Sequence, residues 1–146
     1  MLNIVGGRQK PRALGQVERL YDQIAAGDLP RAATLLGTVV RLKGENLIVS
    51  REPGRALPEH VSLVPRQSLV WDQRFLITNV SDDQGLVAAA TDFMPRHRLE
   101  TFLGFKVTTP AEAIRTAPMV RDAKGDVLSL GGWSFDDRIK VELLID

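Results

Sequence analysis

The 146-residue sequence contains no cysteine. Disulfide bonds, thiolate nucleophiles and thiolate zinc ligands are therefore excluded as features of this chain. A chain without cysteine is compatible with a reducing compartment, and we expect the cytoplasm. A short apolar patch at the start of the sequence is followed by charged residues, which is the wrong order and length for a secretory signal, so no export is expected.

Histidine is also scarce, since His60 and His97 are the only two in the chain. Neither has a second histidine at the spacing of a metal-binding helix, so no metal site is predicted. His97 stands between two arginines that disfavour its charged form, and this context predicts a basic loop rather than a catalytic base. No serine stands in a GxSxG elbow, and the acid pairs at 82–83 and 136–137 have the context of turns. No catalytic residue is predicted.

Long apolar runs are missing as well. With 44% hydrophobic and 25% charged residues and a mean hydropathy of −0.06, the composition is too apolar for a disordered chain and too interrupted by charge for a membrane span. A length of 146 residues suits one soluble domain with a single core and a small N-terminal appendage.

The net charge of +1 hides an asymmetry between the two halves of the chain. Residues 1–76 contain 11 Lys or Arg and 7 Asp or Glu, whereas residues 77–146 contain 8 and 11, so the halves carry +4 and −3. A local excess of positive charge can attract a polyanion even when the whole protein is near neutral. Contact with a nucleic acid is one interpretation of the basic half, and an ordinary solvated surface is the other.

The N-terminal part predicts a linker followed by one helix. Residues 5–12, VGGRQKPR, combine glycine, proline and the basic residues Arg8, Lys10 and Arg12, without the pattern of a phosphate-binding loop. Residues 15–28 then place Val17, Leu20, Tyr21 and Ile24 at helical spacing, and Gly27 follows as a stop.

From residue 32 the pattern changes to that of short strands. The runs at 33–42 and 46–52 predict a hairpin with Lys43 and Glu45 at its tip, 69–80 and 85–93 are separated by a turn at 81–85, and 119–130 predict a further hairpin through AKGD. The segment 139–145 predicts a last strand, and 110–118 predict a short helix bounded by prolines.

These patterns predict an α+β fold. An N-terminal amphipathic helix precedes a mainly antiparallel β domain, a sandwich or partial barrel, with one short internal helix. The expected division is a linker and helix over residues 1–30 and a β-rich C-terminal domain over residues 31–146.

The segment LVWDQRF at 69–75 carries the clearest local hypothesis. If it is one strand, Trp71 and Phe75 share a face and pack into the core, while Arg74 points the other way. Asp72 is expected to pair with a neighbouring arginine such as Arg51, and the alternative for this segment is direct stacking on a nucleic-acid base. Trp133 and Phe135 in the segment 130–137 are likewise expected to cover the core.

Several segments in order resemble the C-terminal region of bacterial tRNA(Ile)-lysidine synthetases, particularly of the α-proteobacterial type. They are VGGRQKPR, VERLYDQI, TLLGTVVRLKGENLIVSREPG, LVWDQRF and AEAIRTAPMVRDAKGDVLSL, which together cover most of the chain. In that family an N-terminal domain with an SGGxDS loop uses ATP to adenylate the wobble cytidine, lysine then attacks, and the C-terminal regions help to bind tRNA.

The SGGxDS loop does not occur in this sequence. The resemblance therefore implies a non-catalytic, tRNA-binding accessory domain, with ATP and Mg²⁺ expected only in the separate catalytic half, which is a possible partner along with tRNA. The candidate contacts to RNA are Arg41, Lys43, Arg51, Arg55 and Arg74, since RNA helices are bound mainly through phosphates and 2′-hydroxyls. A protein-interaction domain and a small standalone enzyme remain the alternatives, the second requiring a deep cleft with a histidine beside a carboxylate.

Overall fold

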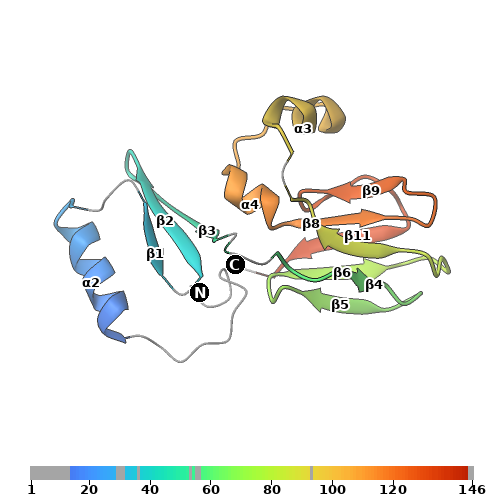
Figure 1. The fold of residues 1–146 in the computed structure, drawn as a ribbon, viewed down its shortest axis with the longest axis horizontal. Helices are drawn as coiled ribbons and strands as arrows, with labels where there is room; N and C mark the ends of the chain where they lie inside the picture. The colour runs from blue at the N-terminus through green and yellow to red at the C-terminus, as the bar shows by residue number, and fades with distance from the viewer. Residues whose placement is uncertain are drawn as a thin grey trace.

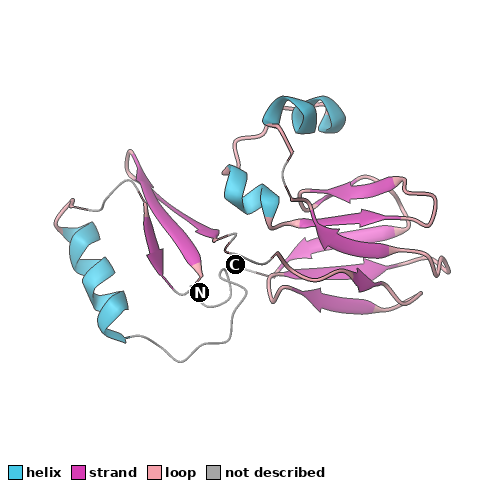
Figure 2. Cartoon of the chain, in the orientation of Figure 1, coloured by secondary structure: helices cyan, strands magenta, loops and turns pink. Residues whose placement is uncertain are grey.

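The computed structural model describes residues 14–28, 32–35, 37–52, 54, 57–92 and 94–144. Short antiparallel strands dominate it, and helices cover little of the chain (Figures 1 and 2). The predicted α+β class is confirmed. The elements in chain order are α2 (Leu14–Ala25), β1 (Ala33–Leu35), β2 (Thr38–Lys43), β3 (Asn46–Arg51), β4 (Val61–Ser62), β5 (Ser68–Trp71), β6 (Phe75–Asn79), β7 (Val87–Ala90), α3 (Arg96–Leu103), α4 (Ala111–Arg115), β8 (Pro118–Arg121), β9 (Val127–Leu130), β10 (Trp133–Ser134) and β11 (Ile139–Leu143).

The predicted N-terminal helix is present as α2, and it packs on the sheet formed by β1, β2 and β3 (Figure 1). Leu20 is buried with Leu35 and Val40, and Ile24 packs against them. Tyr21 was expected on the same face but is 71% exposed, because the narrow sheet covers only the Leu20 and Ile24 positions. Gly27 has a φ of 71° and donates to the Ile24 carbonyl, as a C-terminal stop requires.

The hairpin of β2 and β3 is confirmed. Lys43 pairs with Asn46, and Gly44 and Glu45 form the turn between them. The apolar run at 33–42, however, is not one strand. Gly37, with a φ of 75°, reverses the chain so that β1 pairs with β2, and the sheet order is β1-β2-β3.

Two further sheets share the main core. One has the order β10-β9-β8-β7-β4, and the other has the order β11-β6-β5. The core between them contains Trp71 and Ile77 from the smaller sheet and Val120 and Leu128 from the larger. Strands β8 and β9 form the hairpin predicted at 119–130, and the last strand is β11.

The turn predicted at 81–85 is present, but it does not close a hairpin. Strand β6 pairs with β5 and β11, whereas β7 pairs with β4 and β8, so residues 80–86 cross from one sheet to the other. Asp83 stabilises this crossing by accepting a hydrogen bond from the Gly85 N–H at 2.8 Å.

The expectation of a basic loop around His97 is wrong, because residues 96–103 form helix α3. Pro95 precedes its first turn, Gly104 ends it in a left-handed conformation, and Leu99 is buried beneath it. The short helix predicted at 110–118 is confirmed as α4, with Ile114 buried. Both helices pack over a second core cluster that contains Leu99, Val107, Ile114, Met119 and Leu130.

Candidate functional site

Residues 71–74 form a tight turn rather than the middle of a strand. The Arg74 N–H donates to the Trp71 carbonyl at 3.2 Å, and the central residues Asp72 and Gln73 have φ angles of 50° and 58°. Two positive φ angles are typical of the hairpin turn that matches the strand twist. Trp71 and Phe75 therefore face each other across β5 and β6, both buried as predicted, with ring centroids 6.2 Å apart.

Arg74 does not point outward, and that expectation is wrong because the turn removes the strand alternation on which it rested. The Arg74 side chain is buried and donates through Nε to Asp72 Oδ2 at 2.9 Å and through Nη2 to the Thr116 carbonyl. Burial lowers the pKa of the Arg74 guanidinium below its ordinary value, and the Asp72 carboxylate opposes that shift.

The predicted pairing of Asp72 with Arg51 is confirmed. Arg51 Nε lies 2.7 Å from Asp72 Oδ2, although its N–H is not aligned for a hydrogen bond, and Arg51 Nη1 donates to the Glu52 carbonyl at 2.8 Å. Arg51 and Arg74 are only 6% and 4% exposed. These two candidate RNA contacts therefore form an internal pair around one carboxylate and are not on the surface.

The other candidates are placed differently. Arg41 and Lys43 lie at the surface of the β2–β3 hairpin, whereas Arg55 lies outside the described residues. Arg41 and Lys43 line a groove of about 500 Å³ between β2 and the segment that connects α3 with α4. We call it the basic groove, and its lining residues are Arg41, Leu42, Lys43, Ile48, Arg96, Val107, Thr108 and Pro110.

Hydrogen bonds fix the side of the basic groove that is formed by α3 and the segment after it. Arg96 at the start of α3 donates to the carbonyls of Val107 and Thr109, and the Glu100 carboxylate accepts the Val107 N–H at 2.8 Å. On the β2 side of the groove, Arg41 Nη1 lies 2.7 Å from Glu112 Oε1. Lys43 has no ion-pair partner within the described residues. The groove therefore combines two positioned guanidinium groups with one available ammonium group.

Further basic residues lie close in the chain to the residues that line the basic groove. Lys106 is exposed and directly precedes Val107 in the groove wall, and Arg98 is exposed on α3, two positions after Arg96. These residues belong to the acidic half of the sequence and were not predicted as contacts. The PRHR run signalled basic surface, but only the fold brings α3 beside the β2–β3 hairpin.

An aromatic cluster lies between α3 and β10. Phe102 packs on Phe135 with ring centroids 5.3 Å apart, and Phe105 packs on Trp133 at 5.7 Å. Trp133 also packs against the core around Leu99, as expected. Phe135 covers the core less than expected, since it is 48% exposed.

Nothing in the described part of the chain assembles a catalytic or metal centre around the histidines. His60 and His97 are both exposed. Over the same residues, no group of three or more His, Asp or Glu side chains is placed to hold a metal ion. In the described ranges, no helix is long and apolar enough to cross a membrane.

Sequence comparison finds similarity to two curated proteins named tRNA(Ile)-lysidine synthase. The one from Rickettsia bellii strain OSU 85-389 is 36% identical over 88 residues, and the one from strain RML369-C is 35% identical over 88 residues. In both, the match covers 60% of this chain and 20% of the relative, so the chain spans about a fifth of the length of these relatives.

No family model matches this chain, and no solved structure matches it. The curated relatives nevertheless confirm the resemblance that the ordered segments predicted. Over 60% of its length, this chain is similar in sequence to one region of the tRNA(Ile)-lysidine synthases.

Proposed function

We propose that this chain is a tRNA-binding accessory region of a tRNA(Ile)-lysidine synthase and that the basic groove contacts the tRNA backbone. The observation that carries the proposal is the convergence of Arg41, Lys43 and Arg96 in one groove, beside Lys106. The similarity to proteins named as acting on tRNA(Ile) supplies the partner.

Phosphate recognition accounts for the residue types in the groove. A guanidinium held by its neighbours loses little freedom when it binds a phosphate, and Arg96 and Arg41 are held in this way. Lys43 and Lys106 add mobile positive charges at the rim. Scattered cations of this kind suit an RNA helix, which is bound mainly through phosphates and 2′-hydroxyls.

We propose that the catalytic steps take place outside the chain described here. Adenylation of the wobble cytidine and attack by lysine, with the ATP and Mg²⁺ that they use, are proposed for a separate catalytic domain in the cytoplasm. The chain described here would increase the affinity of that enzyme for tRNA and help to orient it, because each phosphate contact releases counterions and adds to binding.

A tRNA titration with single-site variants tests the proposal. Lys43→Gln and Lys106→Gln should each weaken binding of tRNA(Ile), since each removes a positive charge from the groove rim without disturbing a hydrogen bond in the described residues. Lys124→Gln is the control, because Lys124 is also exposed but lies in the turn between β8 and β9. Equal affinity for all three variants and the wild type would contradict the proposal.

A protein-interaction role is the second candidate, and the aromatic cluster is the observation that favours it. Phe102, Phe105 and Phe135 are 53%, 47% and 48% exposed, and grouped exposed apolar side chains are typical of interaction surfaces. The partner would be the catalytic domain. Sedimentation of this chain with that domain should show a complex that Phe102→Ser weakens, and no complex would leave only the RNA role.

A further inference from the structure

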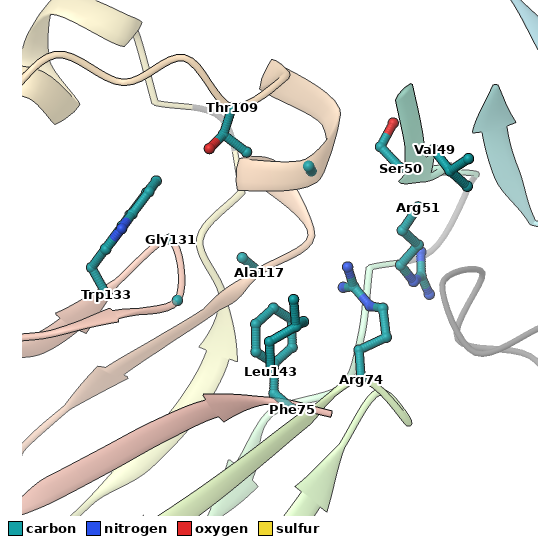
Figure 3. A pocket seen from close by; sticks show the side chains of 12 residues that line it. Val49, Ser50, Arg51, Arg74, Phe75, Thr109, Ala117, Gly131, Trp133 and Leu143 are labelled. Atoms are coloured by element: carbon teal, nitrogen blue, oxygen red, sulfur yellow. The ribbon is translucent and has the colours of Figure 1, made fainter. Parts of the chain in front are cut away.

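A cavity of about 380 Å³ lies between β3, the turn before β6, helix α4 and the turn that joins β9 to β10. Figure 3 shows Arg51 and Arg74 together on one side of it and Trp133 on the opposite side. This volume is within the usual range of small-molecule sites. The basic groove has different lining residues, so this cavity is a separate feature.

Two glycines shape the apolar wall of the cavity. Gly131 and Gly132 have φ angles of 61° and 90°, and both line the cavity. A Cβ atom on Gly131 would lie 2.9 Å from the Trp133 ring, and one on Gly132 would lie 3.3 Å from the Phe75 ring. The absence of side chains at these two positions therefore lets the Trp133 and Phe75 rings pack close to the backbone, and the two rings form the apolar part of the cavity wall.

Among the described residues, the opposite wall carries two guanidinium groups and one carboxylate, and the Arg74 guanidinium also lies 5.1 Å from the centre of the Phe75 ring. Arg51 and Arg74 are both more than nine-tenths buried, and within the described residues Asp72 is the one carboxylate that pairs with either. A buried charge without a partner is costly unless another group of opposite sign compensates it. The described hydrogen bonds use Nε and Nη2 of Arg74 and Nη1 of Arg51, which leaves Arg74 Nη1 and Arg51 Nη2 as donors for a ligand.

We infer that this cavity binds a small organic anion that carries a flat apolar ring. The anionic group would accept hydrogen bonds from Arg51 and Arg74, since the planar guanidinium matches the geometry of carboxylates and phosphates. The ring would lie against Trp133 and Phe75. A ligand with only one of the two parts would leave either the charge or the apolar wall without a partner.

Calorimetric titration with matched probes tests this assignment. The two anionic probes are indole-3-acetate and cytidine 5′-monophosphate, which distinguish a carboxylate from a phosphate. Their neutral counterparts are 3-methylindole and cytidine, and the bare anions are acetate and inorganic phosphate. At least one anionic probe should bind one to one, at least about tenfold more tightly than its neutral counterpart and its bare anion.

Two variants locate the site. Ala113→Leu fills the cavity from α4, and Leu143→Glu places a negative charge beside the cavity at a residue that is 58% exposed. Each should weaken the probe at least about tenfold. Ala25→Leu on the exposed end of α2 is the control and should bind like the wild type.

Three results would overturn the inference. They are saturation by neither anionic probe, equal binding of a probe and its neutral counterpart or bare anion, and binding that both folded variants retain. Folding is checked by far-ultraviolet circular dichroism, and Leu143→Glu keeps the test decisive if Ala113→Leu does not fold. Because groove variants such as Lys43→Gln should leave probe binding unchanged, a failure here is distinguishable from a failure of the tRNA proposal.

Discussion

The burial of Trp71 could be predicted from its sequence context alone. An apolar run that includes tryptophan predicts a core position, and Trp71 is 2% exposed in the main core. Arg74 could not be placed in the same way, because the strand alternation assumed for residues 69–75 ends at the turn. Asp72 and Gln73 occupy the two central positions of this turn. They are a weak signal for it, because glycine and asparagine are the usual residues there.

Trp71→Ala should lower the free energy of unfolding by about 3–5 kcal/mol, since it removes a large buried ring from a closely packed core. Urea denaturation of the purified chain measures this change. Phe135→Ala is the control, because Phe135 is 48% exposed and should lose far less. Equal losses for the two variants would mean that Trp71 does not have the core position described.

The charges around Asp72 make a second prediction at this scale. Asp72→Asn keeps a residue that tolerates positive φ but leaves Arg51 and Arg74 without a carboxylate, so it should cost about 3–5 kcal/mol of unfolding free energy. Arg74→Met leaves the pair of Arg51 and Asp72 intact and should cost less. The same denaturation experiment compares them, and a larger loss for Arg74→Met would contradict the shared-carboxylate account.

At the scale of elements, the sequence was sufficient to predict a helix or a turn where several local signals agreed. The apolar spacing of α2, the prolines around α4 and the AKGD turn between β8 and β9 all predicted elements that the structure contains. Helix α3 was missed because it has only 8 residues and its basic first turn resembles a loop. The pairing of β6 with β11 could not be predicted, since it joins segments about 60 residues apart through tertiary packing alone.

Arg138 connects three turns through three carboxylates, and we expect acid to weaken this connection. It lies within 3.3 Å of carboxylate oxygens of Asp83, Asp122 and Asp136. Burial raises the pKa of Asp122, but hydrogen bonds from the Asp126 and Lys124 N–H groups and from Arg138 outweigh it and hold that pKa below its ordinary value. A hydrogen bond from Arg138 lowers the pKa of Asp136 in the same direction.

A carboxyl group whose pKa is lowered by folding stabilises the protein fully above its ordinary value of 3.8 and loses that contribution as the pH falls through the lower value. The melting temperature of the wild type should therefore fall as the solution is acidified below about pH 3.8. Arg138→Gln should start from a lower melting temperature at neutral pH and fall less. Parallel acid profiles for the two proteins would contradict this role of Arg138.

At the scale of the whole molecule, charge that is dispersed in the sequence is gathered by the fold. The β2–β3 hairpin contributes Arg41 and Lys43, and the α3–α4 segment contributes Arg96 and Lys106 from the acidic half of the chain. Counting charge along the sequence indicated Arg41 and Lys43 as candidate contacts. It did not indicate Arg96 and Lys106, which lie in the half with net negative charge. It also included Arg51 and Arg74, whose burial no charge count could indicate.

The salt dependence of tRNA binding tests the central claim most directly. The dissociation constant of tRNA(Ile) should be measured over a series of salt concentrations for the wild type and for the double variant Lys43→Gln with Lys106→Gln. We expect strong weakening with salt in the wild type and, in the variant, a slope that is smaller by about one to two units. A wild-type affinity that does not change with salt, or an unchanged slope in the variant, would contradict the account.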